Sequence, residues 1–199
     1  MKPTYFIVFI AMFGVGLASY FFVKSDLFPV LIVDSHFVST REFNDHVSAL
    51  SQYYATLIKD KKLSDASITS VDQIRGELRR AALEQFIEDT LIDEGFGKKV
   101  GSMEEKKLVD EKLGEINEKI AAPQFSEAVQ AQYGLSVDRF KEMALVPQAR
   151  RELLTAKLAD EKKEFGKWRT DARKSASVHI LLRGFMWDGE MVKVVMSKW

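Results

Sequence analysis

The first 24 residues differ from the rest of the chain because they carry one long apolar tract. Residues 5–23 contain no charged side chain, and Lys2 and Lys24 flank them. As a helix, this tract would extend about 28 Å, close to the roughly 30 Å hydrocarbon core of a bilayer. The pattern predicts an N-terminal transmembrane helix over residues 1–24, a signal anchor that places the protein in the inner (plasma) membrane with a single pass.

A cleaved signal peptide is the alternative interpretation of the same tract. Small residues at 16–18 (GLA) would suit a cleavage site after Ala18, so that the mature chain would begin at Ser19. The tract continues to Val23, which makes it longer than a usual signal core and favours the anchor. Because Lys2 lies before the tract, we expect the short N-terminal tail in the cytoplasm and the remaining domain in the periplasm or extracytoplasmic space.

Beyond a short linker at residues 25–29, the apolar pattern predicts a strand and then a helix. Residues 30–33 (VLIV) are β-branched and apolar, which is typical of a short buried strand, and residues 34–36 suit a turn. Ser39 lies three residues before Glu42, the spacing of a capping box. Apolar side chains follow at helical intervals, so we expect a helix from there to about residue 58.

Four further helices are predicted from apolar stripes that are bounded by capping residues, glycine or proline. We expect residues 71–94 ending at Gly95, 102–120 opened by a Ser102–Glu105 capping box, 125–133 ending at Gly134, and 136–172 kinked at Pro147. Residues 25–175 would thus form a mainly α domain of about five helices.

After Ser175 the apolar period changes from helical to alternating. Val178, Ile180 and Leu182 alternate with His179, Leu181 and Arg183, which is a strand signal. Asp188-Gly189 is a strong hairpin-turn signal before the apolar run 191–196. Residues 176–199 are therefore expected to form a C-terminal β-hairpin. Since the strand at 30–33 is too short to be stable alone, we expect a small β element that joins it to this hairpin.

Composition and charge exclude several classes of protein. Lys and Arg number 29, as do Asp and Glu, so the chain lacks the basic excess of a nucleic-acid binder. The absence of cysteine excludes disulfide scaffolds, thiol nucleophiles and cysteine-ligated metals. Residues 34–94 carry seven basic and twelve acidic side chains, and residues 139–174 carry eleven and six. This asymmetry indicates either complementary helix packing or a basic surface for anionic lipid headgroups or acidic chain segments.

Catalytic motifs are missing from the sequence. His36, His46 and His179 are far apart and fit no metal-ligand spacing. Neighbouring carboxylates such as Glu88 and Asp89 would point to different sides of a helix, so they cannot form a close pair on one face. Neither a nucleophile elbow nor a Walker loop is present. We therefore expect no catalytic residue, no metal and no cofactor.

Apolar and aromatic side chains stand out instead. Phe185, Met186, Trp187 and Met191 crowd the predicted hairpin, which has little fold of its own to cover them. Methionine and aromatic side chains adapt to varied apolar ligands, and an exposed patch of them marks a binding site. Tyr53 on the first predicted helix is a weaker candidate for the same surface.

Five pieces, taken in their order, resemble a family of folding factors. The first two are a single N-terminal membrane helix and a short strand followed by a turn and a capped VSTREF helix. ELRRAALEQFIEDTLIDEGFGKKVG resembles the long helix of SurA-, PpiD- and PrsA-type chaperones, and SEAVQAQYGLSVDRFKEMALVPQARRELLTAKL resembles the helix pair that follows it in that family. ASVHILLR resembles the first strand of their parvulin prolyl-isomerase domain. The resemblance covers roughly residues 30–183. The matching positions include Leu83, Phe86, Ile87, Leu91, Ile92, Tyr133, Gly134, Leu135, Ser136 and Phe140.

The resemblance implies a membrane-anchored, ATP-independent chaperone or holdase that binds unfolded or nascent secreted and membrane proteins. His179 matches the family's first active-site histidine by position, but only 16 residues follow Arg183 and they include no second histidine. The parvulin catalytic domain is thus missing, and catalysis is not carried over. Two alternatives stay open: a parvulin-type peptidyl-prolyl cis-trans isomerase with a reduced or truncated catalytic domain, and a non-catalytic envelope adaptor protein.

Overall fold

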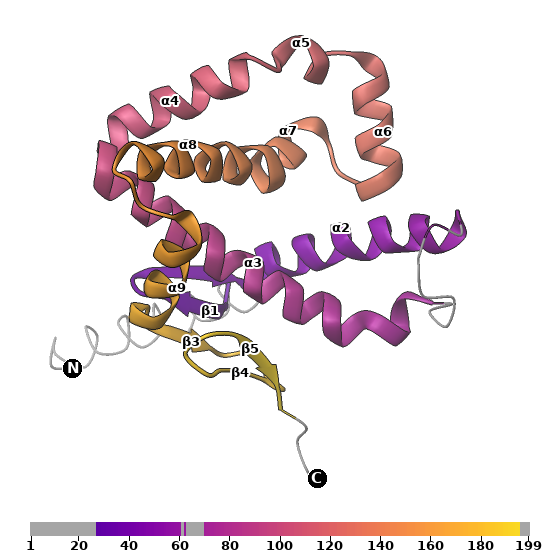
Figure 1. The fold of residues 1–199 in the computed structure, drawn as a ribbon. Helices are drawn as coiled ribbons and strands as arrows, with labels where there is room; N and C mark the ends of the chain where they lie inside the picture. The colour runs from indigo at the N-terminus through magenta and orange to yellow at the C-terminus, as the bar shows by residue number, and fades with distance from the viewer. Residues whose placement is uncertain (1–26, 61, 63–69, 196–199) are drawn as a thin grey trace, which may run out of the picture.

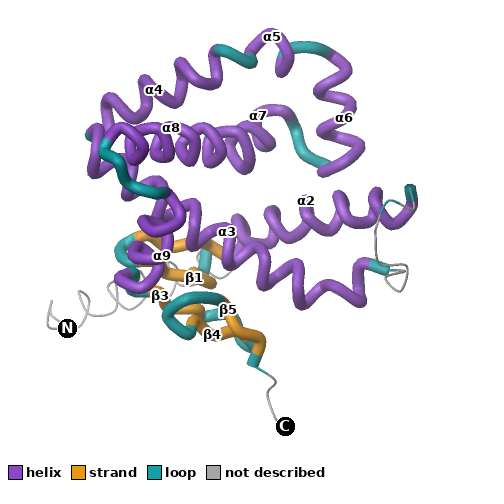
Figure 2. The backbone as a smooth tube through the Cα atoms, in the orientation of Figure 1, coloured by secondary structure: helices purple, strands orange, loops and turns teal. Residues whose placement is uncertain are grey.

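The computed structural model describes residues 27–60, 62 and 70–195, in which helices dominate and two small sheets lie at one end (Figures 1 and 2). The strands are β1 (Pro29–Val33), β2 (His36–Ser39), β3 (Val178–Ile180), β4 (Phe185–Trp187) and β5 (Val192–Val194). The helices are α2 (Thr40–Lys59), α3 (Val71–Val100), α4 (Ser102–Gly114), α5 (Asn117–Ile120), α6 (Pro123–Tyr133), α7 (Val137–Phe140), α8 (Val146–Asp160) and α9 (Phe165–Ser175). A π-helical turn, Lys141–Leu145, joins α7 to α8.

The expected fold class and localisation need correction at the membrane segment. The predicted transmembrane helix at residues 5–23 lies outside the described residues. In the part of the chain that the structure describes, no helix combines the length and the apolar character needed to cross a bilayer. In those described ranges the fold is mainly helical with two small sheets, and they give no support for the expected single-pass inner-membrane protein.

The first sheet joins the two ends of the described chain. Its strand order is β2-β1-β3, and both pairings are antiparallel. Leu31 lies opposite Ile180, which confirms the expected pairing of the first strand with the segment after residue 176. The turn at Asp34 (φ 50°) contacts the residue before β3, because Ser177 donates its backbone N–H to Asp34 Oδ1 at 2.9 Å. Strand β2 was not expected, since residues 34–36 were interpreted as a turn alone.

The C-terminal hairpin forms a sheet of its own, not further strands of the first sheet. Strands β4 and β5 pair with each other, and the predicted Asp188-Gly189 turn connects them. Gly189 has a φ of 97°, and Asp188 Oδ1 accepts the backbone N–H groups of Glu190 and Met191. Val192 is fully buried against α3, so the hairpin contributes to the core.

Helix α3 runs through the whole fold and supplies side chains to two apolar cores. The first core lies between the strands, α2 and the middle of α3, and the second lies between the C-terminal half of α3, α4 and α8. The largest fully buried side chains are shared between them: Phe43, Leu31, Leu83, Ile87, Val33 and Val192 in the first, and Phe96, Ile92, Leu154 and Leu158 in the second.

Gly95 does not end α3, although the sequence predicted a left-handed cap there. The helix continues to Val100, and Gly101 (φ 82°) makes the break. A side chain at Gly95 would collide with the indole ring of Trp168, so this glycine makes room for packing between α3 and α9. Ser102 is likewise not a cap, because α4 starts at Ser102 itself and the side chain of Glu105 bonds to Arg150.

The long helix expected over residues 136–172 is divided in the structure. Ser136 caps α7 as predicted, accepting the backbone N–H of Arg139. A π-helical turn then precedes Pro147, whose ring would clash with the carbonyl four residues back in a regular α-helix. The chain leaves the helix after Asp160, where Lys162 has a φ of 55°, and α9 begins at Phe165.

The charge asymmetry between the two halves is explained by complementary packing. Arginines of α8 and α9 face carboxylates of α3. Arg150 Nε lies 2.9 Å from Asp93 Oδ1, and Arg151 Nη1 lies 2.8 Å from Glu88 Oε1. The structure thus confirms the first of the two interpretations, in which opposite charges on packed helices neutralise each other.

Candidate functional site

A groove of about 330 Å³ opens between β2, α2, α3 and the start of α8. Five of its lining residues are apolar, and the other nine are polar or charged. The apolar ones are Phe37, Val38, Phe86, Met143 and Pro147. Phe37 is 65% exposed, although it lies between two elements that are otherwise packed into the fold. An aromatic ring left this open beside a hollow is available to contact an apolar ligand.

Local capping places the side chains around this groove. Ser39 ends β2 and accepts the backbone N–H of Glu42 at 3.2 Å, so α2 starts directly beside the strand. Glu42 and His46, one turn apart on α2, therefore face the groove. On the opposite side, the π-helical turn before Pro147 brings Met143 to the groove.

Burial shifts the pKa of two titratable side chains in the groove. His46 is only 7% exposed, its Nε2 lies 3.0 Å from Gln85 Oε1, and its ring packs against Phe86 at 5.0 Å. This burial lowers the pKa of His46 below its ordinary value of 6.5, so the imidazole is neutral at pH 7. Burial also raises the pKa of Asp89 to about 6, against the opposing attraction of Arg151.

The arginines of the groove are already paired, whereas two of its carboxylates are not. Arg139 contacts Asp45 at 3.1 Å and Glu142 at 2.9 Å, and Arg150 contacts Asp93 and Glu105. Across the described ranges, neither Glu42 nor Asp89 has a cation within ion-pair distance. The groove therefore offers apolar surface together with two negative charges that a bound cation could neutralise.

A cluster of half-buried aromatic rings lies between α2 and α6. Tyr53, which the sequence suggested as a binding residue, stacks on Tyr133 with ring centroids 5.2 Å apart. Tyr133 in turn contacts Phe140 at 5.0 Å. Tyr53 thus joins α2 to α6, and the structure uses it for packing rather than leaving its ring open.

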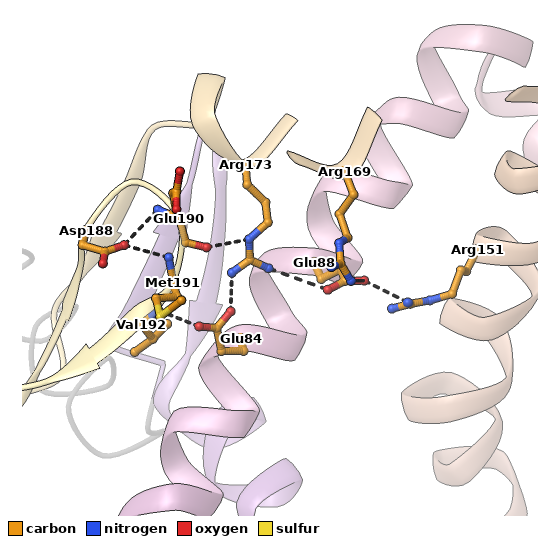
Figure 3. A network of polar contacts seen from close by, with 9 residues as sticks. All are labelled: Glu84, Glu88, Arg151, Arg169, Arg173, Asp188, Glu190, Met191 and Val192. Atoms are coloured by element: carbon orange, nitrogen blue, oxygen red, sulfur yellow. Dashed lines mark hydrogen bonds and ion pairs between the residues drawn. The ribbon is translucent and has the colours of Figure 1, made fainter. Parts of the chain in front are cut away.

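Phe185 and Trp187 of the hairpin also pack against the rest of the fold, whereas the sequence led us to expect them on an exposed binding surface. Phe185 and Trp187 are half-buried and pack against the first core. The guanidinium carbon of Arg173 lies 5.0 Å from the centroid of the Trp187 ring. Arg173 also pairs with Glu84 and donates from Nε to the backbone oxygen of Glu190 at 2.8 Å (Figure 3). Glu84 also accepts the backbone N–H of Val192, so α3, α9 and the hairpin are joined in one network (Figure 3).

Met186 and Met191 keep the exposure that the sequence suggested. Their exposed fractions are 49% and 45%, but they lie on the hairpin and do not line the groove. The structure therefore does not bring the five predicted binding residues together in one patch. Phe37, Met143 and Pro147 were not predicted as binding residues, and Pro147 was expected only to kink a helix.

A wider hollow of about 960 Å³ lies between α3 and α9, with Trp168 in its wall. Its four lysines face an equal number of carboxylates. The lysines are Lys98, Lys162, Lys163 and Lys167, and the carboxylates are Asp34, Glu94, Glu164 and Asp171. This balance of charge gives no preference for an anionic ligand, and the smaller groove is the better candidate site.

The histidines lie in three separate environments. His36 Nδ1 lies 3.1 Å from Glu94 Oε1, and His46 bonds to Gln85 inside the groove. His179 is exposed on β3 with Nε2 3.2 Å from Ser177 Oγ. This pair of His179 and Ser177 is exposed and does not line the groove, so the groove is described best as a binding surface.

Comparison with known proteins adds no relative to this picture. No description of a known family, no curated protein and no solved structure matches the chain. The resemblance to SurA-, PpiD- and PrsA-type chaperones stays a prediction from short motifs. The functional argument consequently depends on the groove itself.

Proposed function

We propose that the protein is an ATP-independent holdase that binds segments of unfolded or nascent polypeptides in the groove beside β2. The observation that carries the proposal is the ring of Phe37, which is 65% exposed beside a groove that Met143 and Pro147 also line. A holdase meets many sequences, so it needs accessible apolar side chains that adapt to their ligand rather than a precise polar pocket. The family resemblance in the sequence points the same way.

Phe37 and Met143 are the side chains that we expect to contribute most to client binding. Burial of one such side chain stabilises a complex by about 1.5–3 kcal/mol, which corresponds to at least tenfold in affinity. The double substitution Phe37→Ser with Met143→Ser should therefore weaken suppression of client aggregation, measured by light scattering of a denatured test protein. Circular dichroism should show unchanged helix content, because neither side chain is fully buried.

Met103 offers a matched control. It is 89% exposed on α4 and does not line the groove. Met103→Ser should leave suppression unchanged. Equal suppression by the wild type and the double variant would contradict the proposal, and dependence on a single client would favour the adaptor alternative.

A further inference from the structure

We propose, building on the holdase function above, that the client segment binds as an added β-strand along the free edge of β2, and that the preferred segments alternate apolar and basic side chains. Backbone hydrogen bonds to the edge would supply affinity for any sequence, and the groove would select the side chains. This mode of recognition needs an unpaired strand edge, a neighbouring apolar hollow and complementary charge.

The pairing pattern leaves the backbone of Phe37 free on the outer edge of the sheet. The backbone N–H of Asp34 donates to the carbonyl of Ser177, and the N–H of Leu181 donates to the carbonyl of Val30. The backbone groups of residues 30, 32 and 34 are therefore directed toward β3. In an antiparallel sheet the alternate residues then bond to the other neighbour. Phe37 lies opposite Ile32, one of the residues that bonds to β3, and its own N–H and C=O consequently point away from β1.

The groove lies along this edge. His36, Phe37 and Val38 are consecutive in β2, and all three line the hollow. Successive side chains of a strand point to opposite faces, so a hollow that touches all three must border the strand's edge. The strand itself is held in place, because His36 contacts Glu94 and Ser39 caps α2.

Charge complementarity identifies the segment. Glu42 and Asp89 line the groove without an ion-pair partner in the described part of the chain, whereas Arg139 and Arg150 are each engaged by two carboxylates. A lysine or arginine of the client could therefore form a close ion pair with Glu42 or Asp89, which Arg139, Arg150 and Arg151 attract only from beyond ion-pair distance. Its apolar residues would meet Phe37, Met143 and Pro147, which gives the alternating pattern.

The test uses the full chain and a short synthetic peptide that alternates valine and lysine around a central tyrosine. Peptide affinity is measured by fluorescence anisotropy, and amide exchange is followed by NMR. On binding, the Phe37 amide should become protected. The amides of His36 and Val38, which the pairing directs toward β1, should change little.

Two substitutions at Phe37 separate the backbone from the side chain. Phe37→Pro removes the outward N–H, and proline is tolerated at the edge of a sheet. It should weaken binding by about tenfold more than Phe37→Ala, which keeps that donor. Circular dichroism and peptide-free NMR spectra check that both variants keep the fold.

The peptide can be tested in the same way. N-methyl groups on one alternate set of residues should abolish binding, whereas the other set should be tolerated, since an added strand presents one edge to β2. Glu42→Gln with Asp89→Asn should lower affinity for the lysine peptide by about threefold, with no change for a peptide carrying serine in place of lysine.

Several outcomes would overturn the added strand. They are an unprotected Phe37 amide in the bound state, equal affinities of the proline and alanine variants, or tolerance of both N-methylated peptides. If protection of the Phe37 amide depended on protein concentration and not on peptide, a second copy of the chain would be pairing with β2. That result would also reject a client strand. If the proline variant loses no client suppression while the Phe37→Ser, Met143→Ser variant does, the added strand fails and the holdase function stands.

Discussion

At the scale of single residues, the clearest constraint in the fold is the space at Gly95. The indole of Trp168 lies where a β-carbon at this position would be, so α9 can approach α3 closely. We expect Gly95→Ala to lower the free energy of unfolding by about 1–3 kcal/mol, because overpacking forces the ring or the helix to move.

Gly76 provides the control in the same helix. It has no neighbour within 4 Å of a β-carbon, so Gly76→Ala should stabilise the protein by about 0.5–1 kcal/mol. Urea denaturation of both variants measures the difference. Destabilisation by both substitutions, or by neither, would show that the contact with Trp168 does not control this position.

Asp89 predicts a dependence of stability on pH. Its pKa of about 6 in the fold exceeds its ordinary value of 3.8, so the folded state binds this proton more tightly than the unfolded state. The free energy of unfolding that this group contributes therefore rises as the pH falls from about 6 to about 4. Asp89→Asn should stabilise the protein by about 2 kcal/mol at pH 7.5, and the gain should vanish near pH 4.

The comparison for Asp89 is Asp110→Asn, a change at an exposed residue of α4. It should alter stability by less than about 0.5 kcal/mol at either pH. A gain in the Asp89 variant that stays constant between pH 4 and pH 7.5 would contradict the assignment of a raised pKa to this carboxyl.

The role of a single residue is predictable from the sequence where it depends on neighbouring backbone groups. It is not predictable where it depends on a residue far away in the chain. Ser39, Ser136 and Gly134 end or start helices as predicted, because capping depends on residues three or four positions away. Gly95 was interpreted as a cap because its contact with Trp168, 73 positions away, leaves no local signal.

Between elements, Arg173 of α9 links three parts of the fold. It pairs with Glu84, lies 3.6 Å from Glu88, and donates to the hairpin at Glu190 (Figure 3). Only 13% of its side chain is exposed. Loss of one partner from a buried pair leaves an uncompensated charge, so Arg173→Met should lower the free energy of unfolding by about 3 kcal/mol.

Arg75 is the matched control, since it pairs with Asp72 in an exposed position on α3. Arg75→Met should change stability by less than about 1 kcal/mol. Both values come from thermal or urea denaturation. The amides of β4 and β5 should also exchange faster in the Arg173 variant alone, and an unchanged hairpin would contradict the role of this network.

The existence of most helices followed from the apolar period, whereas strand β2 and the division of the last helix did not. Periodicity identifies long amphipathic segments well, because their spacing repeats over many turns. A four-residue strand offers too few alternations, and His36–Ser39 also overlaps a capping signal. The break after Asp160 has only Lys162 in the left-handed region, a residue without a turn preference.

For the whole molecule, the candidate site arises from segments far apart in the chain. The groove combines β2 and α2 with α3 and with residues 139–150, so no single stretch of sequence contains it. The aromatic-rich hairpin was the more visible signal in the sequence, but Arg173 and the first core absorb Phe185 and Trp187. An apolar residue becomes a binding residue only if the fold leaves it uncovered, which tertiary packing decides.

Site-specific photo-cross-linking tests the central claim that the groove holds polypeptide clients. A photoreactive phenylalanine analogue is placed at position 143, beside the groove, or at position 103 on the exposed face of α4. Each full-length variant is illuminated with an unfolded test protein. We expect cross-links from position 143 that disappear when the client is folded, and few from position 103. Equal cross-linking from both positions, or none from position 143, would contradict client binding in the groove.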